Sequence, residues 1–226
     1  MDLEKILKAS GKTRQWLEDQ LITTEDEALE AVKENGYKLL FVKNQTEDIC
    51  MAAVKHNGRA LKFVSNQTEA ICMAAVKEEG LALMYVKNQT EDICLAAVKR
   101  RGYALKFAEL QTEAICMAAV EHDPCALQYI KNQTEAVCLA AVKRRGYALK
   151  FVKNQTEDIC LAAVKNDGRA LQSVKDQTED ICAAAVKKHQ HALNCLEKPI
   201  TQEASSEQNV DAPRFMDDKI SILKDF

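Results

Sequence analysis

A 22-residue repeat runs through most of the chain and constrains its fold more than any other feature. The stretch KNQTEDIC occurs at residues 43–50, 87–94 and 153–160, and close variants fill the intervals. The glutamine of this motif recurs without an insertion at Gln45, Gln67, Gln89, Gln111, Gln133, Gln155 and Gln177. Strict repetition at this period is typical of α-solenoids, in which each unit buries its apolar face against its neighbours.

Each repeat is predicted to begin with a helix. Thr46 is the expected N-cap, because its hydroxyl can accept a hydrogen bond from a free amide of the first turn. Glu47 and Asp48 follow, and they place negative charge where the helix dipole is positive. Residues 49–54 are apolar on all sides, which indicates a helix buried between neighbouring units.

A glycine column is predicted to end this first helix. Six of the seven glycines in the chain occupy the column of Gly58, so we expect a left-handed residue there. Pro124 takes the same column and cannot reach a positive φ, so the turn at this proline is expected to follow a different path. A shorter second helix, as in RALKFVS, should follow, with Asn66 closing it as a left-handed cap.

The composition agrees with a helical protein and narrows its function. Few glycines, prolines and aromatic residues favour helices over a β-sandwich. A net charge of −3 argues against a general nucleic-acid binder. The N-terminal sequence lacks the apolar core of a secretory signal, and no apolar run approaches the length of a membrane span.

The motifs N-Q-T-E-D-I-C-L-A-A-V-K and G-Y-A-L-K-F-V, in this order, resemble the short helical repeats known as domain of unknown function 4116. The resemblance covers roughly residues 24–198. It implies an α-helical repeat array of a kind found in amoeba-associated bacteria such as Legionella and in giant viruses, and it supplies no catalytic residue. The sequence departs from the pattern at Glu109, Leu110 and Cys125, so these layers are expected to pack or bind differently.

Four segments are expected along the chain. Residues 1–23 should form an N-terminal helical cap, and residues 24–198 an α-solenoid of about eight helix-turn-helix repeats. Residues 199–213 are polar and predict a flexible linker. Residues 214–226 form a short amphipathic segment, which is either a C-terminal cap or a signal, since it resembles the C-terminal signals of type IV secreted effectors.

Seven cysteines also keep the 22-residue step, ending with Cys160 and Cys182. Neighbouring members should lie one helix layer apart, about 8–10 Å, which is too far for a disulfide and too scattered for a zinc site. We therefore expect each to fill a small apolar slot in a reducing compartment. Cys125 and Cys195 lie off this column and are the candidates for reactive thiols.

No other constellation predicts a metal, a cofactor or an enzyme. His189, His191 and Cys195 lie close together in the sequence but have no metal-binding spacing. Gly11-Lys12-Thr13 resembles the end of a phosphate-binding loop, but Ile6 stands where the first glycine of that loop is required. We expect no cofactor, no metal site and no catalytic residue.

The repeats differ most at the turn between their two helices. Arg100, Arg101 and Tyr103 recur two layers on, and the full set of candidate partner-binding residues is Arg100, Arg101, Tyr103, Arg144, Arg145 and Tyr147. Two such clusters could bind an acidic partner, because arginine and tyrosine are favoured at interface hot spots. The alternative is a solvated edge with no partner.

The sequence therefore predicts a non-enzymatic protein-binding scaffold. One form of this prediction is an effector that is delivered from the bacterial cytoplasm into a host cell. A first alternative is a thiol-dependent activity that uses Cys125 or Cys195. A second is a helical repeat that reads nucleic acid, although the acidic net charge opposes it. The expected partner is an acidic protein, and neither nucleic acid nor a membrane span is expected.

Overall fold

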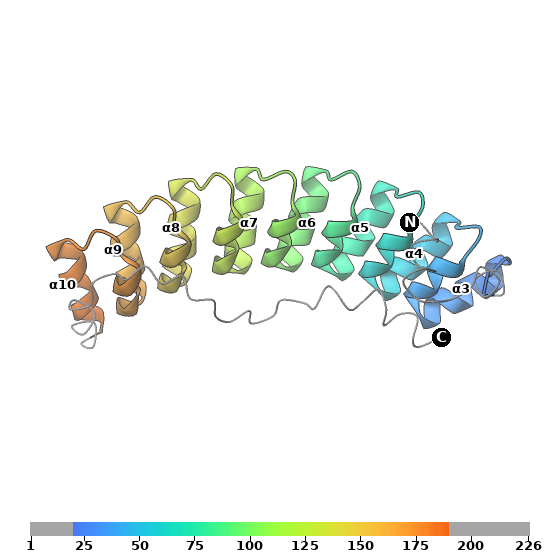
Figure 1. Ribbon diagram of the computed structural model, residues 1–226, viewed down its shortest axis with the longest axis horizontal. Helices are drawn as coiled ribbons and strands as arrows, with labels where there is room; N and C mark the ends of the chain where they lie inside the picture. Colours follow the sequence, from blue (N-terminus) through green and yellow to red (C-terminus); the bar gives the residue numbers. More distant parts are fainter. Residues whose placement is uncertain (1–19, 190–226) are drawn as a thin grey trace, which may run out of the picture. The chain divides into compact units, whose positions relative to one another are not determined.

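The computed structural model describes residues 20–189, which form a series of paired helices (Figure 1). Each full repeat contains a ten-residue α-helix followed by a six-residue 3-10 helix. The α-helices are α3 (Glu25–Glu34), α4 (Glu47–His56), α5 (Glu69–Glu78), α6 (Glu91–Arg100), α7 (Glu113–His122), α8 (Glu135–Arg144), α9 (Glu157–Asn166) and α10 (Glu179–Lys188). The 3-10 helices are η1 (Gly36–Phe41), η2 (Gly58–Phe63), η3 (Gly80–Tyr85), η4 (Gly102–Phe107), η5 (Pro124–Tyr129), η6 (Gly146–Phe151) and η7 (Gly168–Ser173).

The predicted all-α fold with 22-residue helix-turn-helix repeats is confirmed. Residues 20–189 contain no β-strand, although an isolated parallel bridge joins Ile22 to Val42. The second helix of each repeat is a 3-10 helix, a type that the sequence pattern does not distinguish from a short α-helix.

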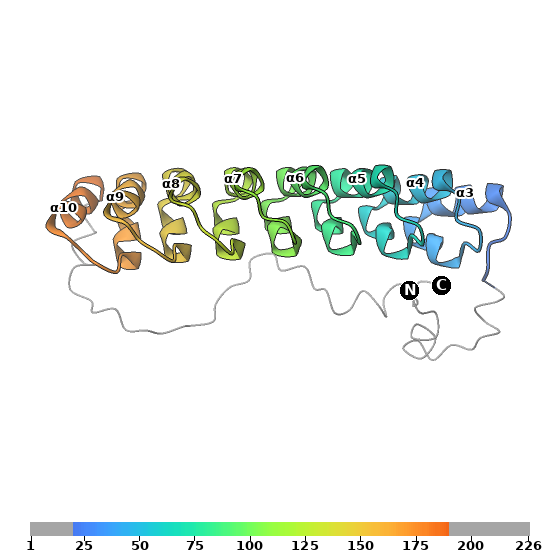
Figure 2. The same cartoon turned by 90° about the horizontal axis from the view of Figure 1, so that it is seen from above.

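The described residues divide into two compact units. The first ends at residue 78, after α5, and the second begins at residue 79, before η3. Within each unit, the α-helices form one row and the 3-10 helices form a second row beside it (Figure 2). Most of the expected N-terminal cap, the end of the solenoid beyond residue 189, and the segments 199–213 and 214–226 lie outside the described residues.

Threonine caps α4 to α10 as predicted, whereas Thr24 makes no side-chain cap at the start of α3. The Ile49 N–H donates to Oγ1 of Thr46 at 3.4 Å, and the same bond begins each of the helices from α5 to α10. The threonine hydroxyl also donates to the first glutamate of the preceding α-helix, as from Thr134 to Glu113 at 3.2 Å. This glutamate therefore joins neighbouring layers in addition to complementing the helix dipole.

One face of each α-helix carries the core. In α8, Val137, Cys138, Ala141 and Val142 are buried, whereas Leu139 is only half-buried on the outer face. The prediction of a helix buried on all sides is therefore wrong for the outer face. Each fully buried leucine, isoleucine or valine contributes about 1.5–3 kcal/mol to stability, and every layer supplies several.

The repeated glutamine holds neighbouring layers together. The Gln133 side chain, between η5 and α8, donates to the Leu127 carbonyl of η5 at 3.1 Å and to the Phe151 carbonyl of η6 in the next layer at 2.9 Å. Oε1 of Gln133 accepts from the Lys153 N–H, just after η6, at 2.9 Å. The same oxygen lies 3.7 Å from Sγ of Cys138. All four hydrogen-bonding positions of the amide are used.

In this arrangement the glutamine side chain replaces a segment of backbone. At the first described layer, the Ile22 N–H donates to the Phe41 carbonyl at 2.9 Å, and the Ile22 carbonyl accepts from the Lys43 N–H at 3.0 Å. Gln45 makes the same pair of bonds one layer on, to the Phe63 carbonyl and from the Ser65 N–H. The primary amide of glutamine can do this because it has the donor and acceptor geometry of a peptide group.

The glycine column is not left-handed, so that prediction is wrong. None of the five glycines Gly36, Gly80, Gly102, Gly146 and Gly168 has its φ in the left-handed region. The reason for glycine is close packing: a Cβ on Gly102 would lie 2.6 Å from the carbonyl oxygen of Ala119 in the next α-helix. The column therefore marks where a 3-10 helix touches the backbone of the following layer.

Pro124 does not divert the chain, which is a second correction. The preceding Asp123 has φ −142° and ψ 110°, close to the −146° and 111° of Arg145 at the same place in the next layer. In three layers the column residue donates its N–H to the side chain of the last residue of the next α-helix: Gly36 to His56, Gly102 to His122, and Gly146 to Asn166 at 2.8 Å. The residue opposite Pro124 is Arg144, whose side chain has no hydrogen-bond acceptor. Proline, which lacks an N–H, therefore gives up no hydrogen bond at this position.

Candidate partner-binding surface

The six predicted residues occupy one edge of the second unit, which we call the turn edge. Arg100 ends α6, Arg101 links α6 to η4, and Tyr103 is the second residue of η4. Arg144, Arg145 and Tyr147 take the same places in α8 and η6. The layer between them places His122, Asp123 and Cys125 on the same edge.

The linking arginines replace residues that cap the 3-10 helix. Asp123 and Asp167 each accept a hydrogen bond from the N–H two residues on, at 2.9 and 3.0 Å, and Asn57 does the same in the first unit. Arg101 and Arg145 make no such cap. Losing a cap of this kind costs about 0.5–2 kcal/mol in helices, so arginine here is not the choice that favours stability.

The arginines of the turn edge are exposed, and three of them have no acidic partner among residues 20–189: Arg101, Arg144 and Arg145. Arg169 shows the contrast, because its guanidinium lies 3.0 Å from the Asp167 carboxylate. That hydrogen bond lowers the pKa of Asp167 and raises the pKa of Arg169. In the layers of Arg101 and Arg145, an arginine takes the place of this aspartate. The guanidinium charges of Arg101 and Arg145 therefore have no carboxylate beside them among residues 20–189.

The two tyrosines are not equivalent. Tyr103 is half-buried and packs edge-on against Tyr129 of the next layer, with ring centroids 5.0 Å apart. Tyr147 is 46% exposed, and Nζ of Lys150 lies 4.0 Å from its ring centroid. A partner can therefore contact Tyr147 directly, whereas Tyr103 mainly joins two layers.

Cys125 lies between the two arginine clusters but is a poor nucleophile. Its side chain is partly buried, and Sγ lies 4.0 Å from the Tyr147 hydroxyl. Burial raises the pKa of the Cys125 thiol, and the nearby Asp123 carboxylate raises it further. Because the thiolate is the reactive form, little of it exists near neutral pH. The other candidate, Cys195, lies outside the described residues.

Burial also raises the pKa of five repeated cysteines, but their slots are not wholly apolar; the five are Cys50, Cys94, Cys116, Cys138 and Cys160. Cys50 is buried, and burial raises the pKa of its thiol to about 11. Its Sγ lies 3.9 Å from Oε1 of Gln45, so the slot ends on a polar amide. Cys182 of α10 is only half-buried.

Neither a metal site nor a membrane helix is found in the described part of the chain. Within residues 20–189, no three His, Cys, Asp or Glu side chains gather closely enough to hold a metal ion. His189 lies 3.5 Å from the Asp167 carboxylate, while His191 and Cys195 fall outside the described residues. No helix of residues 20–189 has the length and apolar character needed to cross a bilayer.

Sequence reasoning missed two features. The first is the role of the glutamine column, which the strict recurrence of Gln45 and its equivalents could have indicated. The second is a hollow between α8 and α9 on the outer face of the α-helix row. The sequence pattern that could have indicated this hollow is a leucine followed four residues later by a lysine, as in Leu139 and Lys143. Residues with this spacing lie on the same face of a helix.

The fold of residues 20–189 defines an α-helical repeat protein. The family model described as "Domain of unknown function (DUF4116)" matches residues 25–69 and 90–135, in the first and the second unit respectively. The resemblance predicted from the repeats is therefore confirmed over these two stretches. No curated protein and no solved structure matches the chain.

Proposed function

We propose that the chain is a non-enzymatic scaffold that binds an acidic surface of another protein through the turn edge. The observation that carries this proposal is the placement of Arg101 and Arg145. Both stand where four other described layers carry a capping residue, namely Asn35, Asn57, Asp123 and Asp167, and both give up that cap. Glu79 makes no cap either, so the two arginine layers differ from the rest in combining a missing cap with added positive charge. Sequence choices that reduce local stability without a structural gain are expected at functional sites.

Charge and geometry favour a protein partner. Arginine is enriched at interface hot spots, and its planar guanidinium pairs well with carboxylates. The two clusters are two layers apart, which corresponds to about 16–20 Å at the usual helix spacing. Tyr147, exposed beside the second cluster, adds an aromatic contact. A partner would need two acidic patches at this separation.

The alternatives have less support. A thiol-dependent activity at Cys125 is disfavoured because burial and Asp123 raise the pKa of the thiol. Nucleic-acid binding is disfavoured by the net charge of −3 and by Asp123, which lies between the two arginine clusters and would repel a phosphate backbone.

Affinity capture from a eukaryotic host-cell lysate tests the proposal when two variants are compared with the wild-type chain. The first variant combines R100E, R101E, R144E and R145E. The control variant combines K55E, K77E, K131E and K187E, which reverses as many exposed charges away from the turn edge. We expect the first variant to lose a partner that the control retains, with both helical by circular dichroism. Equal retention, or equal loss, would refute the proposal.

We further propose that the protein acts as an effector inside a host cell. Two features support this: the resemblance to repeats known from amoeba-associated bacteria, and the mixed charged and apolar composition of residues 214–226. A translocation reporter fused to the chain, with and without these residues, measures delivery by a type IV secretion system. Delivery that does not depend on residues 214–226 would remove their part in the proposal.

A further inference from the structure

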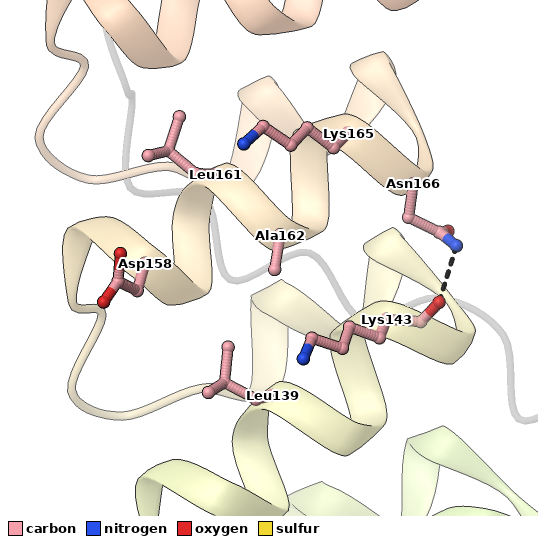
Figure 3. A pocket seen from close by; sticks show the side chains of 7 residues that line it. All are labelled: Leu139, Lys143, Asp158, Leu161, Ala162, Lys165 and Asn166. Atoms are coloured by element: carbon pink, nitrogen blue, oxygen red, sulfur yellow. Dashed lines mark hydrogen bonds between the residues drawn. The ribbon is translucent and has the colours of Figure 1, made fainter.

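A hollow of about 550 Å³ lies between α8 and α9, on the outer face of the α-helix row (Figure 3). Its apolar part consists of Leu139 of α8 with Leu161 and Ala162 of α9, all half-buried. The volume lies within the range of ligand pockets, about 300–1,000 Å³. The hollow is open to solvent, so it suits a side chain presented by a macromolecule better than an enclosed small molecule.

The charges around the hollow are uneven. Lys143 and Lys165 border it on the side where the helices end, and Asp158 borders it near the start of α9. In Figure 3 both lysine side chains run back along their helices towards the leucines. Neither lysine forms an ion pair among residues 20–189. A ligand with carboxylates on the lysine side would complement this pattern, whereas Asp158 would repel a carboxylate at the other end.

One end of the hollow is held in place by Asn166. Its Nδ2 donates to the Lys143 carbonyl at 2.7 Å, and its Oδ1 accepts from the Gly146 N–H at 2.8 Å. The Asn166 amide therefore ties the end of α9 to the end of α8 and fixes their separation. A preformed site of this kind loses less entropy when a ligand binds.

The spacing of the two lysines selects a helical ligand. They occupy equivalent positions on adjacent helices, which pack about 8–10 Å apart. An α-helix rises 1.5 Å per residue, so residues seven apart on one face are about 10.5 Å apart. A helix laid across α8 and α9 could therefore bring one carboxylate to each lysine and an apolar side chain between them to the hollow. This is the helix-in-groove mode of recognition.

We propose that the hollow between α8 and α9 binds an amphipathic helix of a partner protein, with a large apolar side chain on Leu139 and Leu161 and two carboxylates seven residues apart on Lys143 and Lys165. The inference rests on the proposed protein-binding function but uses none of the turn-edge residues. It adds a second surface, and it specifies the chemistry and spacing of what binds there.

Fluorescence anisotropy with the full chain and a labelled, helix-stabilised 18-residue peptide tests this inference. The peptide carries two glutamates seven residues apart with a leucine midway, and a second peptide of equal composition carries the glutamates two residues apart. We expect the first peptide to bind the wild-type chain. We expect K143E/K165E, and separately L161D, to weaken it about tenfold or more, and the respaced peptide to bind about tenfold more weakly.

The matched control is K55E/K77E, which reverses the corresponding lysines of α4 and α5 in the first unit. It should change binding less than about twofold, and circular dichroism should show that all variants remain helical. No binding by the wild-type chain, equal binding of the two peptides, or an equal loss in the control overturns the inference. Because this titration does not use the turn edge, its failure is separable from failure of the proposed function.

Discussion

Replacing Gln133 by methionine tests how the layers are held together. Methionine has nearly the same length and shape but can form none of the four interactions of the amide. The change removes the bonds of Gln133 to the Phe151 carbonyl and from the Lys153 N–H, and one of the two bonds of the Leu127 carbonyl, which still accepts from the Ile130 N–H at 3.2 Å. Each lost hydrogen bond costs about 0.5–1.5 kcal/mol, and more where the group left behind is buried. For three bonds we expect the free energy of unfolding to fall by about 2–4 kcal/mol.

Native-state hydrogen exchange of the Lys153 amide is the appropriate assay, because a repeat protein can open locally without unfolding as a whole. A loss of 2 kcal/mol corresponds to a roughly thirtyfold faster exchange of that amide. Urea unfolding followed by circular dichroism gives the global value.

The control for Gln133 is Gln128, an exposed glutamine whose side chain bonds, within residues 20–189, to the Cys125 carbonyl of its own helix alone, at 3.0 Å. We expect Gln128→Met to change stability by less than about 0.5 kcal/mol. If Gln133→Met costs no more than this control, or if the Lys153 amide keeps its protection, the glutamine clamp does not hold the layers together.

Three further predictions follow from the packing and the turn edge. Gly102→Ala places a Cβ 2.6 Å from a backbone carbonyl of α7, and urea unfolding should show a loss of about 1–3 kcal/mol; the variant should still fold, because Pro124 is accommodated in the same column, and an unchanged stability would contradict the close-contact explanation. Arg145→Asn restores a cap for the Tyr147 N–H and should raise stability by about 0.5–1 kcal/mol while weakening partner capture; a loss of stability would show that the arginine supports the fold. Alkylation of Cys125 by iodoacetamide should be slow at neutral pH and should accelerate only at a more alkaline pH than that of a free cysteine, because burial raises the pKa of its thiol; fast reaction at neutral pH would revive the thiol-dependent alternative.

The sequence predicts the elements of the fold because they depend on local rules. The threonine caps, the acidic first turns and the apolar helix faces follow from intrahelical hydrogen bonding and burial, so Thr46 could be assigned correctly. The prediction of a left-handed residue in the column of Gly58 was wrong because a positive φ and a close backbone contact both favour glycine. Only the distance between Gly102 and the next layer distinguishes them.

The parts that sequence could not supply are contacts between layers. Gln133 bonds to groups 18 and 20 residues further along the chain, and no local rule links them. The hollow between α8 and α9 depends on the position of Asn166 in the neighbouring layer. The candidate arginines could be chosen from the sequence because this column varies between copies, but the missing caps of Arg101 and Arg145 are visible only in the structure.

The central claim is that recognition takes place at the turn edge of the second unit. Hydrogen exchange measured with and without a captured partner tests it most directly, because backbone amides report where the partner covers the surface. Partner binding should slow exchange at Tyr103 and Tyr147, whose N–H groups lack a side-chain cap, and leave Arg59 and its neighbours in the first unit unchanged. Protection confined to the first unit, or to the loops before α8 and α9, would contradict the claim.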